Sequence, residues 1–493
     1  MIMGKEIGRV EGSSENQRVM VIALDGATWT TLGKWIEEGK LPNIAKLKRS
    51  GSWGNLTSCI PYVSPVAWPT FFTGVNPGRH GIFGFQQCRA GSTESYIPIG
   101  SDVKSPSLWR ILSQNGKKVI VMNVQNTYPP EEVNGVLIGG LMSPEIAVYP
   151  PSLKNWLERE GYIIEGKGWM NTEKDEFLKS LYKTTDKRVE VAMKLMDRYP
   201  DWDFFMILIS GTDRIQHYLW GQMEDGDKKY GKAIENYYKH VDKLVGKLIE
   251  KADENTTIII MSDHGFGRLR TRVHINHWLE KEGFIKVKNT WSNVKKRFLL
   301  WISGWLKRSG LSELIRKIMV MGGGKPGALR PPTLEIDFDH TKAFTCGYYT
   351  GGISINPKLS GEEYKKVQDE LVSKLKELRD PRTGKKIVKE VYRKQDLFHG
   401  PYTKEAPDVL LVMEDEYWVV GGFNYPWLFE PVIRETGQHR IEGVVIINGP
   451  GIRKNFRLKK AYLWDVAPTI LHIFNISANM DGRVLQEVFL EKM

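Results

Sequence analysis

The stretch Val19-Met-Val-Ile-Ala-Leu24, followed at once by Asp25-Gly26, decides the fold. Consecutive apolar residues without alternation are typical of a parallel strand that helices cover on both faces. The same pattern recurs along the chain, at residues 119–122, 204–209, 257–261 and 444–447. Helical patterns separate these runs, at residues 31–49, 106–115, 173–198 and 227–252. Strands that alternate with helices predict an α/β fold with a mostly parallel central sheet flanked by helices.

Acidic and histidine residues follow three of these runs closely. Asp25 comes directly after the first run, Asp263 and His264 follow the run at 257–261, and Asp213 lies just beyond the run at 204–209. In parallel sheets ligands bind beyond the carboxyl ends of the strands, so we expect these side chains on one rim. One Asp-Gly pair alone would be an ordinary turn. Residues of this kind after three separate strands predict a functional site.

The residue types and spacings at this rim favour a metal site. Carboxylates and neutral imidazoles are the ligands of zinc and of several other divalent metals. Asp213 and His217 are four residues apart, so a helical turn places both on one face. Asp263-His264 is followed by Gly265, which allows the sharp turn that lets both side chains reach one ion.

Ser64-Pro65 is expected to begin a helix, with Ser64 as the N-cap and Pro65 at the first helical position. The hydroxyl would then lie at the positive end of a helix, where phosphoryl groups bind well. A hydroxyl at such a place can also act as a nucleophile when a metal ion favours the alkoxide. The alternative interpretation is an ordinary helix cap.

In this order along the chain, the motifs resemble those of the alkaline phosphatase superfamily, in particular its type I phosphodiesterase/nucleotide pyrophosphatase branch and the prokaryotic phosphohydrolase/phosphomutase-like members. The resemblance runs from residue 19 to about residue 485. It is carried by Leu24-Asp25-Gly26, Leu41-Pro42-Asn43-Ile44, Ser64, Thr73-Gly74, Pro77-Gly78-Arg79-His80-Gly81-Ile82, Asp213, His217, Ser262-Asp263-His264-Gly265 and Gly437-Gln438-His439-Arg440.

This resemblance implies an alkaline phosphatase-like fold that binds two divalent metal ions, and the histidine-rich ligands favour zinc or manganese. One ion would be held by Asp213, His217 and His439. The other would be held by Asp25, Asp263 and His264, with Ser64 touching it as the nucleophile. The implied activity is a metal-dependent phosphatase or phosphodiesterase that works through a covalent phospho-Ser64 intermediate. A phosphomutase and a non-catalytic binding protein on the same scaffold are the alternatives.

The chain departs from the family at one position. Nucleotide-cleaving members carry an Asn shortly after His-Gly-Ile that binds the phosphoryl group, whereas here Phe83-Gly84-Phe85 follow Ile82. Asn123 is a candidate replacement, with a plain loop residue as the alternative. His274 and His277 either line the substrate pocket or have a capping and packing role. The substrate is therefore expected to be a small phosphoester or a lipid headgroup, without evidence for nucleotide specificity.

The domain organisation predicted from the sequence is a flexible tail at 1–18, a catalytic domain at 19–284 and 336–493, and a helical basic insertion at 285–335. Residues 286–330 carry eleven Lys or Arg and one acid, net +10 of the +12 on the whole chain. Trp291, Phe298 and Trp301 recur there at mostly helical spacing. One interpretation is a helical cap that packs its aromatics on the main domain and leaves its cations in solvent. The other is contact with an anionic membrane; nucleic-acid contact is less well indicated.

Composition sets the remaining expectations. The chain has 493 residues, of which 41% are hydrophobic, and its first 18 residues lack the apolar run of a secretory signal. Cys59, Cys88 and Cys346 are too few and too dispersed for a disulfide framework or a zinc ribbon, which fits a reducing compartment; Cys59 is expected to be buried and inert. We therefore expect a cytoplasmic protein, with the insertion available for peripheral contact at the inner membrane surface.

Overall fold

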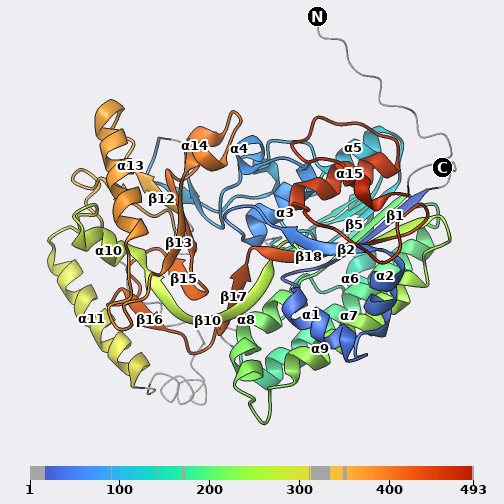
Figure 1. Cartoon of the computed structure of the whole chain (residues 1–493), viewed down its shortest axis with the longest axis horizontal. Helices are drawn as coiled ribbons and strands as arrows, with labels where there is room; N and C mark the ends of the chain where they lie inside the picture. Colours follow the sequence, from blue (N-terminus) through green and yellow to red (C-terminus); the bar gives the residue numbers. More distant parts are fainter. Residues whose placement is uncertain are drawn as a thin grey trace, which may run out of the picture.

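The computed structural model describes residues 17–89, 91–141, 143–168, 172–309, 311, 334–347 and 352–490. Its largest element is a nine-stranded sheet with the order β19-β2-β18-β9-β1-β8-β5-β6-β7 (Figure 1). The strands are β1 (Arg18–Leu24), β2 (Ser52–Thr57), β5 (Val119–Met122), β6 (Gly135–Ile138), β7 (Val148–Tyr149), β8 (Phe204–Ile209), β9 (Thr256–Met261), β18 (Glu442–Asn448) and β19 (Phe456–Arg457).

The central part of this sheet is parallel. β9, β1, β8, β5 and β6 run parallel to one another in consecutive pairs. β18, which contains the predicted run 444–447, is antiparallel to both β9 and β2, and β7 is antiparallel to β6. The prediction of an α/β fold with a mostly parallel central sheet flanked by helices is therefore confirmed.

Helices cover both faces of the sheet because its central strands are apolar on both faces. Along β1, Met20, Ile22 and Leu24 enter one core, whereas Val19 and Val21 enter the other. The first core is closed by α1 (Trp29–Glu37), α2 (Pro42–Ser50), α7 (Lys174–Arg198), α8 (Gly211–Glu224) and α9 (Ala233–Ile249). The second core is closed by α3 (Ser64–Thr73), α5 (Leu108–Gln114) and α15 (Val466–Ile473).

The helix expected at 31–49 is two helices, α1 and α2. Pro42 begins α2, in the first turn where its missing N–H costs nothing. The helix expected at 227–252 begins only at Ala233, because Asp227 turns the chain beforehand by accepting the backbone N–H groups of Lys229 and Tyr230.

A second lobe, at the left of Figure 1, has its own apolar core formed by residues between 273 and 429. One of its sheets has the order β11-β12-β14-β13, and the other is built around the long strand β10. These elements are β10 (Gly265–His274), β11 (Ala343–Phe344), β12 (Gly352–Ile355), β13 (Val388–Arg393), β14 (Val409–Met413), β15 (Glu416–Val420), β16 (Phe429–Pro431), β17 (Gly437–Arg440), α10 (Ile275–Lys281), α11 (Trp291–Arg308) and α13 (Gly361–Lys376). β10 connects the lobes because its start lies at the rim of the large sheet and its end in the second core.

Some predicted segments lie partly outside the described residues: positions 1–16 of the predicted tail, and 310 and 312–333 of the insertion. The described part of the insertion is mainly helix α11. In the portion of the chain that the structure describes, no helix has the length and apolar character needed to cross a membrane.

Cys88 and Cys346 form a disulfide, with their Cα atoms 5.6 Å apart. This pairing was not expected from the sequence, where the two cysteines are separated by 258 positions. Only the fold brings β3 (Gln87–Cys88) beside the segment after β11. Cys59 is buried, and burial raises the pKa of its thiol to about 12, as expected of an inert cysteine.

Candidate active site

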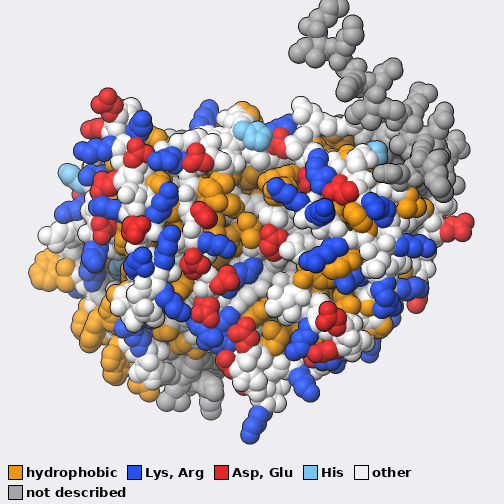
Figure 2. All heavy atoms as spheres, in the orientation of Figure 1, with side chains coloured by type: hydrophobic (Ala, Val, Ile, Leu, Met, Phe, Trp, Pro, Cys, Tyr) orange, Lys and Arg blue, Asp and Glu red, His pale blue; other side chains and the backbone are white. Residues whose placement is uncertain are grey.

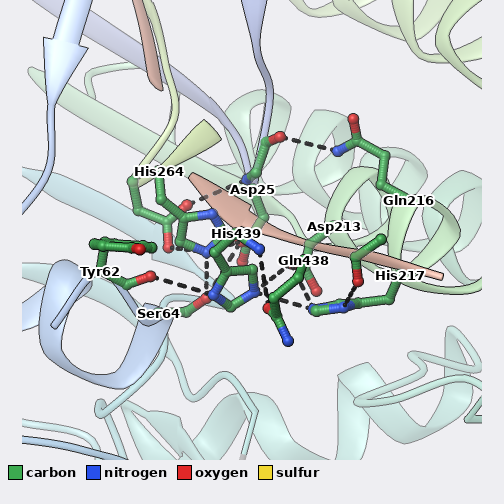
Figure 3. Close-up of polar contacts among 12 residues, drawn as sticks. Asp25, Tyr62, Ser64, Asp213, Gln216, His217, His264, Gln438 and His439 are labelled. Carbon is green, nitrogen blue, oxygen red and sulfur yellow. Dashed lines mark hydrogen bonds and ion pairs between the residues drawn. The ribbon is translucent and has the colours of Figure 1, made fainter. Parts of the chain in front are cut away.

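The residues predicted to bind metal meet near the carboxyl ends of β1, β8 and β9 (Figure 3). Asp25 follows β1, and the next residue, Gly26, has φ +66°. The N–H of Gly26 donates to Oδ1 of Asp263, 3.2 Å away, and so joins the ends of β1 and β9. Asp25 and Asp263 are both fully buried there, at 1% and 0% exposure.

Helix α8 brings Asp213 and His217 to the same rim. Oγ1 of Thr212 donates to the carbonyl of Asp25 at 2.7 Å, and Nε2 of Gln216 donates to the carbonyl of Gly26 at 2.9 Å. These two bonds fix the helix against the turn after β1. Asp213 and His217 face one side of α8, as their spacing predicted, and Oδ1 of Asp213 lies 3.3 Å from Nε2 of His217.

His439 reaches the site through strand pairing. β17 runs antiparallel to β10, and His439 is opposite Phe266 in the register. Its Nε2 lies 3.3 Å from Oδ1 of Asp213, and its ring stacks on His264 with the centroids 3.7 Å apart. Gly265 lets the backbone beyond β17 pass close to the start of β10, because a Cβ there would lie 2.0 Å from the carbonyl oxygen of Glu442.

The three imidazoles share one orientation. Each Nδ1 faces a backbone carbonyl: His217 the oxygen of Gly437 at 3.0 Å, His264 that of Gly265 at 3.0 Å, and His439 that of Tyr62 at 3.2 Å. A carbonyl only accepts, so each Nδ1 carries the proton and each Nε2 keeps its lone pair.

These lone pairs point into the cluster rather than at donors. Nε2 of His217 and Nε2 of His439 are 3.0 Å apart, so two unprotonated nitrogens face each other. That arrangement needs positive charge between the nitrogens, which a metal ion or a proton on one of the rings can supply. It is the arrangement of metal-binding histidines, whose second nitrogen is held by a backbone carbonyl or a carboxylate.

The carboxylates also fit cations. Burial raises the pKa of Asp25 well above its ordinary range, with Asp263 and Asp213 adding to the rise. Oδ2 of Asp263 is buried and has no hydrogen-bond partner among the described residues. Buried carboxylates this close together need positive charge, which divalent ions supply.

Two groups of side chains could each hold a metal ion. One is Asp213, His217 and His439, the same set that the resemblance implied. The other is Asp25, Asp213 and His264, in which Asp213 takes the place expected for Asp263. Asp263 remains at the edge of this second group, with Oδ2 3.3 Å from Nε2 of His264, because its Oδ1 accepts the N–H of Gly26.

Ser64 lies beside the second group. Its Oγ is 3.1 Å from Nε2 of His264 and 3.4 Å from Oδ1 of Asp25. The prediction that Ser64 is the N-cap is wrong, because Val63 holds that position and Ser64 is the first residue of α3. The hydroxyl faces the cluster instead of capping the helix, so the interpretation as an ordinary cap also fails.

A cavity of about 210 Å³ opens beside Ser64 and the first metal group. Most of the residues that line this cavity were not predicted from the sequence. Its apolar lining residues include Val63, Phe85, Leu141 and Trp418, and its polar lining residues include Gln125, Arg214, Glu435 and Gln438.

The predicted substrate residues do not line this cavity. The side-chain oxygen of Asn123 accepts the hydroxyl of Tyr162. Nε2 of His274 lies 2.7 Å from Oε2 of Glu430, and Nε2 of His277 donates to the carbonyl of Tyr425 at 2.6 Å.

Gln125 is the amide that does reach the cavity. It lies two residues after Asn123, is 5% exposed, and its Oε1 has no partner within the described part of the chain. The sequence signal was a polar residue soon after a predicted strand, two positions beyond Asn123.

Glu435 supports the first metal group from behind. Its Oε1 lies 3.5 Å from Nδ1 of His217 and accepts Nε2 of Gln438 at 3.0 Å. Its Oε2 pairs with Arg272. A carboxylate behind a histidine raises the basicity of the ligand nitrogen. No spacing motif contains Glu435, so sequence reasoning missed it.

Residues 19–443 match the family model described as type I phosphodiesterase / nucleotide pyrophosphatase. No curated protein sequence matches the chain.

Solved structures share the fold at low identity. Murine ectonucleotide pyrophosphatase / phosphodiesterase 5 is 13% identical with a TM-score of 0.57, over 96% of this chain and 100% of that one. Phosphonoacetate hydrolase from Sinorhizobium meliloti, in complex with phosphonoformate, is 12% identical with a TM-score of 0.57, over 94% and 96% of the two chains. A variant of the alkaline phosphatase PafA is 14% identical with a TM-score of 0.57, over 97% and 100%.

Proposed function

This chain belongs to the type I phosphodiesterase/nucleotide pyrophosphatase family, and on that premise we propose that it hydrolyses phosphoesters with two divalent metal ions and Ser64 as the nucleophile. The family and the fold make it a phosphoester hydrolase scaffold with groups that could bind metal. The observation that carries the finer proposal is the position of Ser64 Oγ, 3.1 Å from the unprotonated Nε2 of His264 at the edge of the cluster.

The proposed ligands are Asp213, His217 and His439 for one ion, and Asp25 and His264 for the other, with Asp263 beside it. Zinc or manganese fits best, because imidazoles supply so many of the donors. When bound, the ions would neutralise the carboxylates and favour the Ser64 alkoxide.

The chain's own groups then define the reaction. Ser64 Oγ forms a bond to phosphorus while the bond to the ester oxygen breaks, and the hydroxyl proton ends on the leaving alcohol. Water then cleaves the phospho-Ser64 bond and restores the hydroxyl. The reacting group would lie at the positive end of α3, which favours the negative charge of the phosphoryl oxygens.

The cavity suggests the substrate class. Phe85 and Trp418 offer apolar surface next to Ser64, and Gln125 offers an amide. We propose a phosphoester with an apolar or aromatic leaving group. An inactive variant of murine ectonucleotide pyrophosphatase / phosphodiesterase 5 was solved with AMP, so nucleotides belong among the substrates tested.

The test begins with the chelated protein and compares p-nitrophenyl phosphate, bis-p-nitrophenyl phosphate and p-nitrophenyl sulfate after addition of zinc, manganese or magnesium. We expect phosphoester hydrolysis that requires added metal, and a mass increase on the peptide containing Ser64 after acid quenching. An added alcohol that collects the phosphoryl group in place of water would indicate a phosphomutase.

Ser64→Ala should lose turnover but keep both metal ions. Ser58→Ala is the matched control, because its hydroxyl is also buried and has no hydrogen-bond partner among the described residues. Normal hydrolysis by Ser64→Ala would refute the nucleophile role.

A further inference from the structure

Helix α11 has two opposite faces. Asn293, Leu300 and Gly304 are buried against the second lobe. The opposite face is a stripe of exposed apolar residues at spacings of three and four, as one side of a helix requires. We call it the aromatic stripe; it consists of Trp291, Val294, Phe298, Trp301 and Trp305, which are 82%, 51%, 61%, 52% and 52% exposed.

The outward direction of the stripe is fixed by specific contacts on the buried face. Nδ2 of Asn293 donates to the carbonyl of Lys288 at 2.8 Å and to that of Glu335 at 3.2 Å. Gly304 lies so close to the domain that a Cβ there would be 2.4 Å from Cγ of Pro426. The helix therefore cannot turn its aromatic side inward without losing these contacts.

This is the reverse of the cap expected from the sequence, in which aromatics pack inward and cations face solvent. Several cations of α11 contact the domain instead. Lys307 pairs with Glu430, and Arg297 with Glu280 at 2.5 Å. Arg308 lies over the ring of Trp427, 3.9 Å from its centroid. Figure 2 shows the result, with hydrophobic side chains gathered at the lower left edge where Figure 1 places α11.

We propose that α11 lies flat in the surface of an anionic lipid bilayer, with the aromatic stripe among the acyl chains. Tryptophan prefers the boundary between headgroups and hydrocarbon, and an amphipathic helix with basic flanks binds there. Lys295 is exposed on one flank of the stripe and Arg297 on the other. The described residues 286–309 carry seven Lys or Arg and no acid, a charge that anionic headgroups complement.

The same charge argues against the other occupants. A second copy placed stripe to stripe would bring two equally basic segments together. A nucleic acid would satisfy the cations but would leave Val294 and Phe298 against a charged backbone. A bilayer satisfies both the stripe and the cations.

The experiment uses the full chain and extruded vesicles, without any phosphoester substrate. Co-sedimentation is measured with vesicles of phosphatidylcholine alone and of phosphatidylcholine mixed with phosphatidylglycerol, at low and high salt. We expect binding to the mixed vesicles that weakens with salt. The double variant Trp301→Gln/Trp305→Gln should bind them at least about tenfold more weakly, because two large apolar side chains are lost from the contact.

Ile97→Gln is the matched control, since Ile97 is 48% exposed and lies outside α11; it should bind like the wild type. Both variants should hydrolyse a soluble phosphoester at the wild-type rate, which shows that they are folded. Absence of binding at low salt, or equal binding by the double variant, would overturn the proposal. Two other results would also overturn the proposal: a wild-type dimer in light scattering, or binding of a single-stranded oligonucleotide by the wild type. Either counts if the double variant loses it but still binds vesicles.

Discussion

His439→Ala should remove one of two metal ions and leave the other. His439 belongs to the group with Asp213 and His217 but not to the group with Asp25 and His264. Burial, with a further contribution from His264, lowers the pKa of His439 to about 3, so its Nε2 is available as a ligand at neutral pH without losing a proton. The substitution therefore deletes one ligand atom from one site.

The magnitude follows from the number of ligands. Four-ligand structural zinc sites bind with roughly 10–16 kcal/mol, or about 2.5–4 kcal/mol for each ligand. Loss of one of the three protein ligands of this group should then weaken the binding of that ion by about 100- to 1000-fold. The substitution leaves Ser64 and the side chains of the second group in place, so the affinity for the second ion should change far less.

The assay is equilibrium dialysis against buffered zinc, followed by elemental analysis for the metal-to-protein ratio. We expect two ions on the wild type and one on His439→Ala at intermediate free zinc. His277→Ala is the control, because His277 hydrogen-bonds the carbonyl of Tyr425 and faces neither group. If His439→Ala binds two ions as tightly as the wild type, His439 is not a ligand and the reasoning from its orientation fails.

Three further predictions concern Glu435, Gln125 and Asp481. Glu435→Gln should weaken the binding of the ion at His217 by about 10- to 100-fold, measured by competition with a zinc indicator. An unchanged affinity would show that Glu435 does not support this ion. Gln125→Ala should lower kcat/KM by about 10- to 100-fold with unchanged metal content, because a hydrogen bond to a charged group is lost. Asp481→Asn should lower the free energy of unfolding by about 1–2 kcal/mol at neutral pH, measured by urea denaturation. Burial alone would raise the pKa of Asp481, but hydrogen bonds from Asn76 lower it to about 2. The Asp481 carboxylate therefore stabilises the fold at pH values above its ordinary pKa, and this stabilisation should fade as the pH falls towards 2. A difference in unfolding free energy between wild type and variant that does not change with pH would contradict this origin.

Five of the six proposed metal ligands (Asp25, Asp213, His217, Asp263 and His264) could be predicted to share one rim because each of them depends on local structure. Asp263 and His264 follow a strand that is apolar throughout, and Asp213 and His217 need only one helical turn. Once the strands are known to be parallel, their carboxyl ends must meet, whatever the length of chain between them. Short-range patterns and one topological rule were therefore enough to place these five at one rim, whereas His439 was implied only by the resemblance because it arrives there through the pairing of β17 with β10.

The remaining parts depend on contacts between distant segments, which leave no local pattern. Glu435 lies behind His217 only because β17 pairs with β10. Cys88 and Cys346 meet only because the second lobe folds onto the first. The aromatic spacing of α11 predicted a helix but not which face is buried, since that depends on the fit of Gly304 against Pro426.

Gln125 shows how such a distant contact changes the chemistry of the site. Where the resemblance led us to expect an Asn after Ile82, this chain has Phe85, which forms apolar cavity wall. The amide comes instead from the segment after β5, a different strand end from the one that precedes Ser64. Phe85 and Trp418 line the same cavity as Gln125 and add apolar surface to it. On the proposed function this apolar surface would receive the leaving group, so substitutions at Phe85 should change the preference among esters more than the rate of the phosphoryl chemistry.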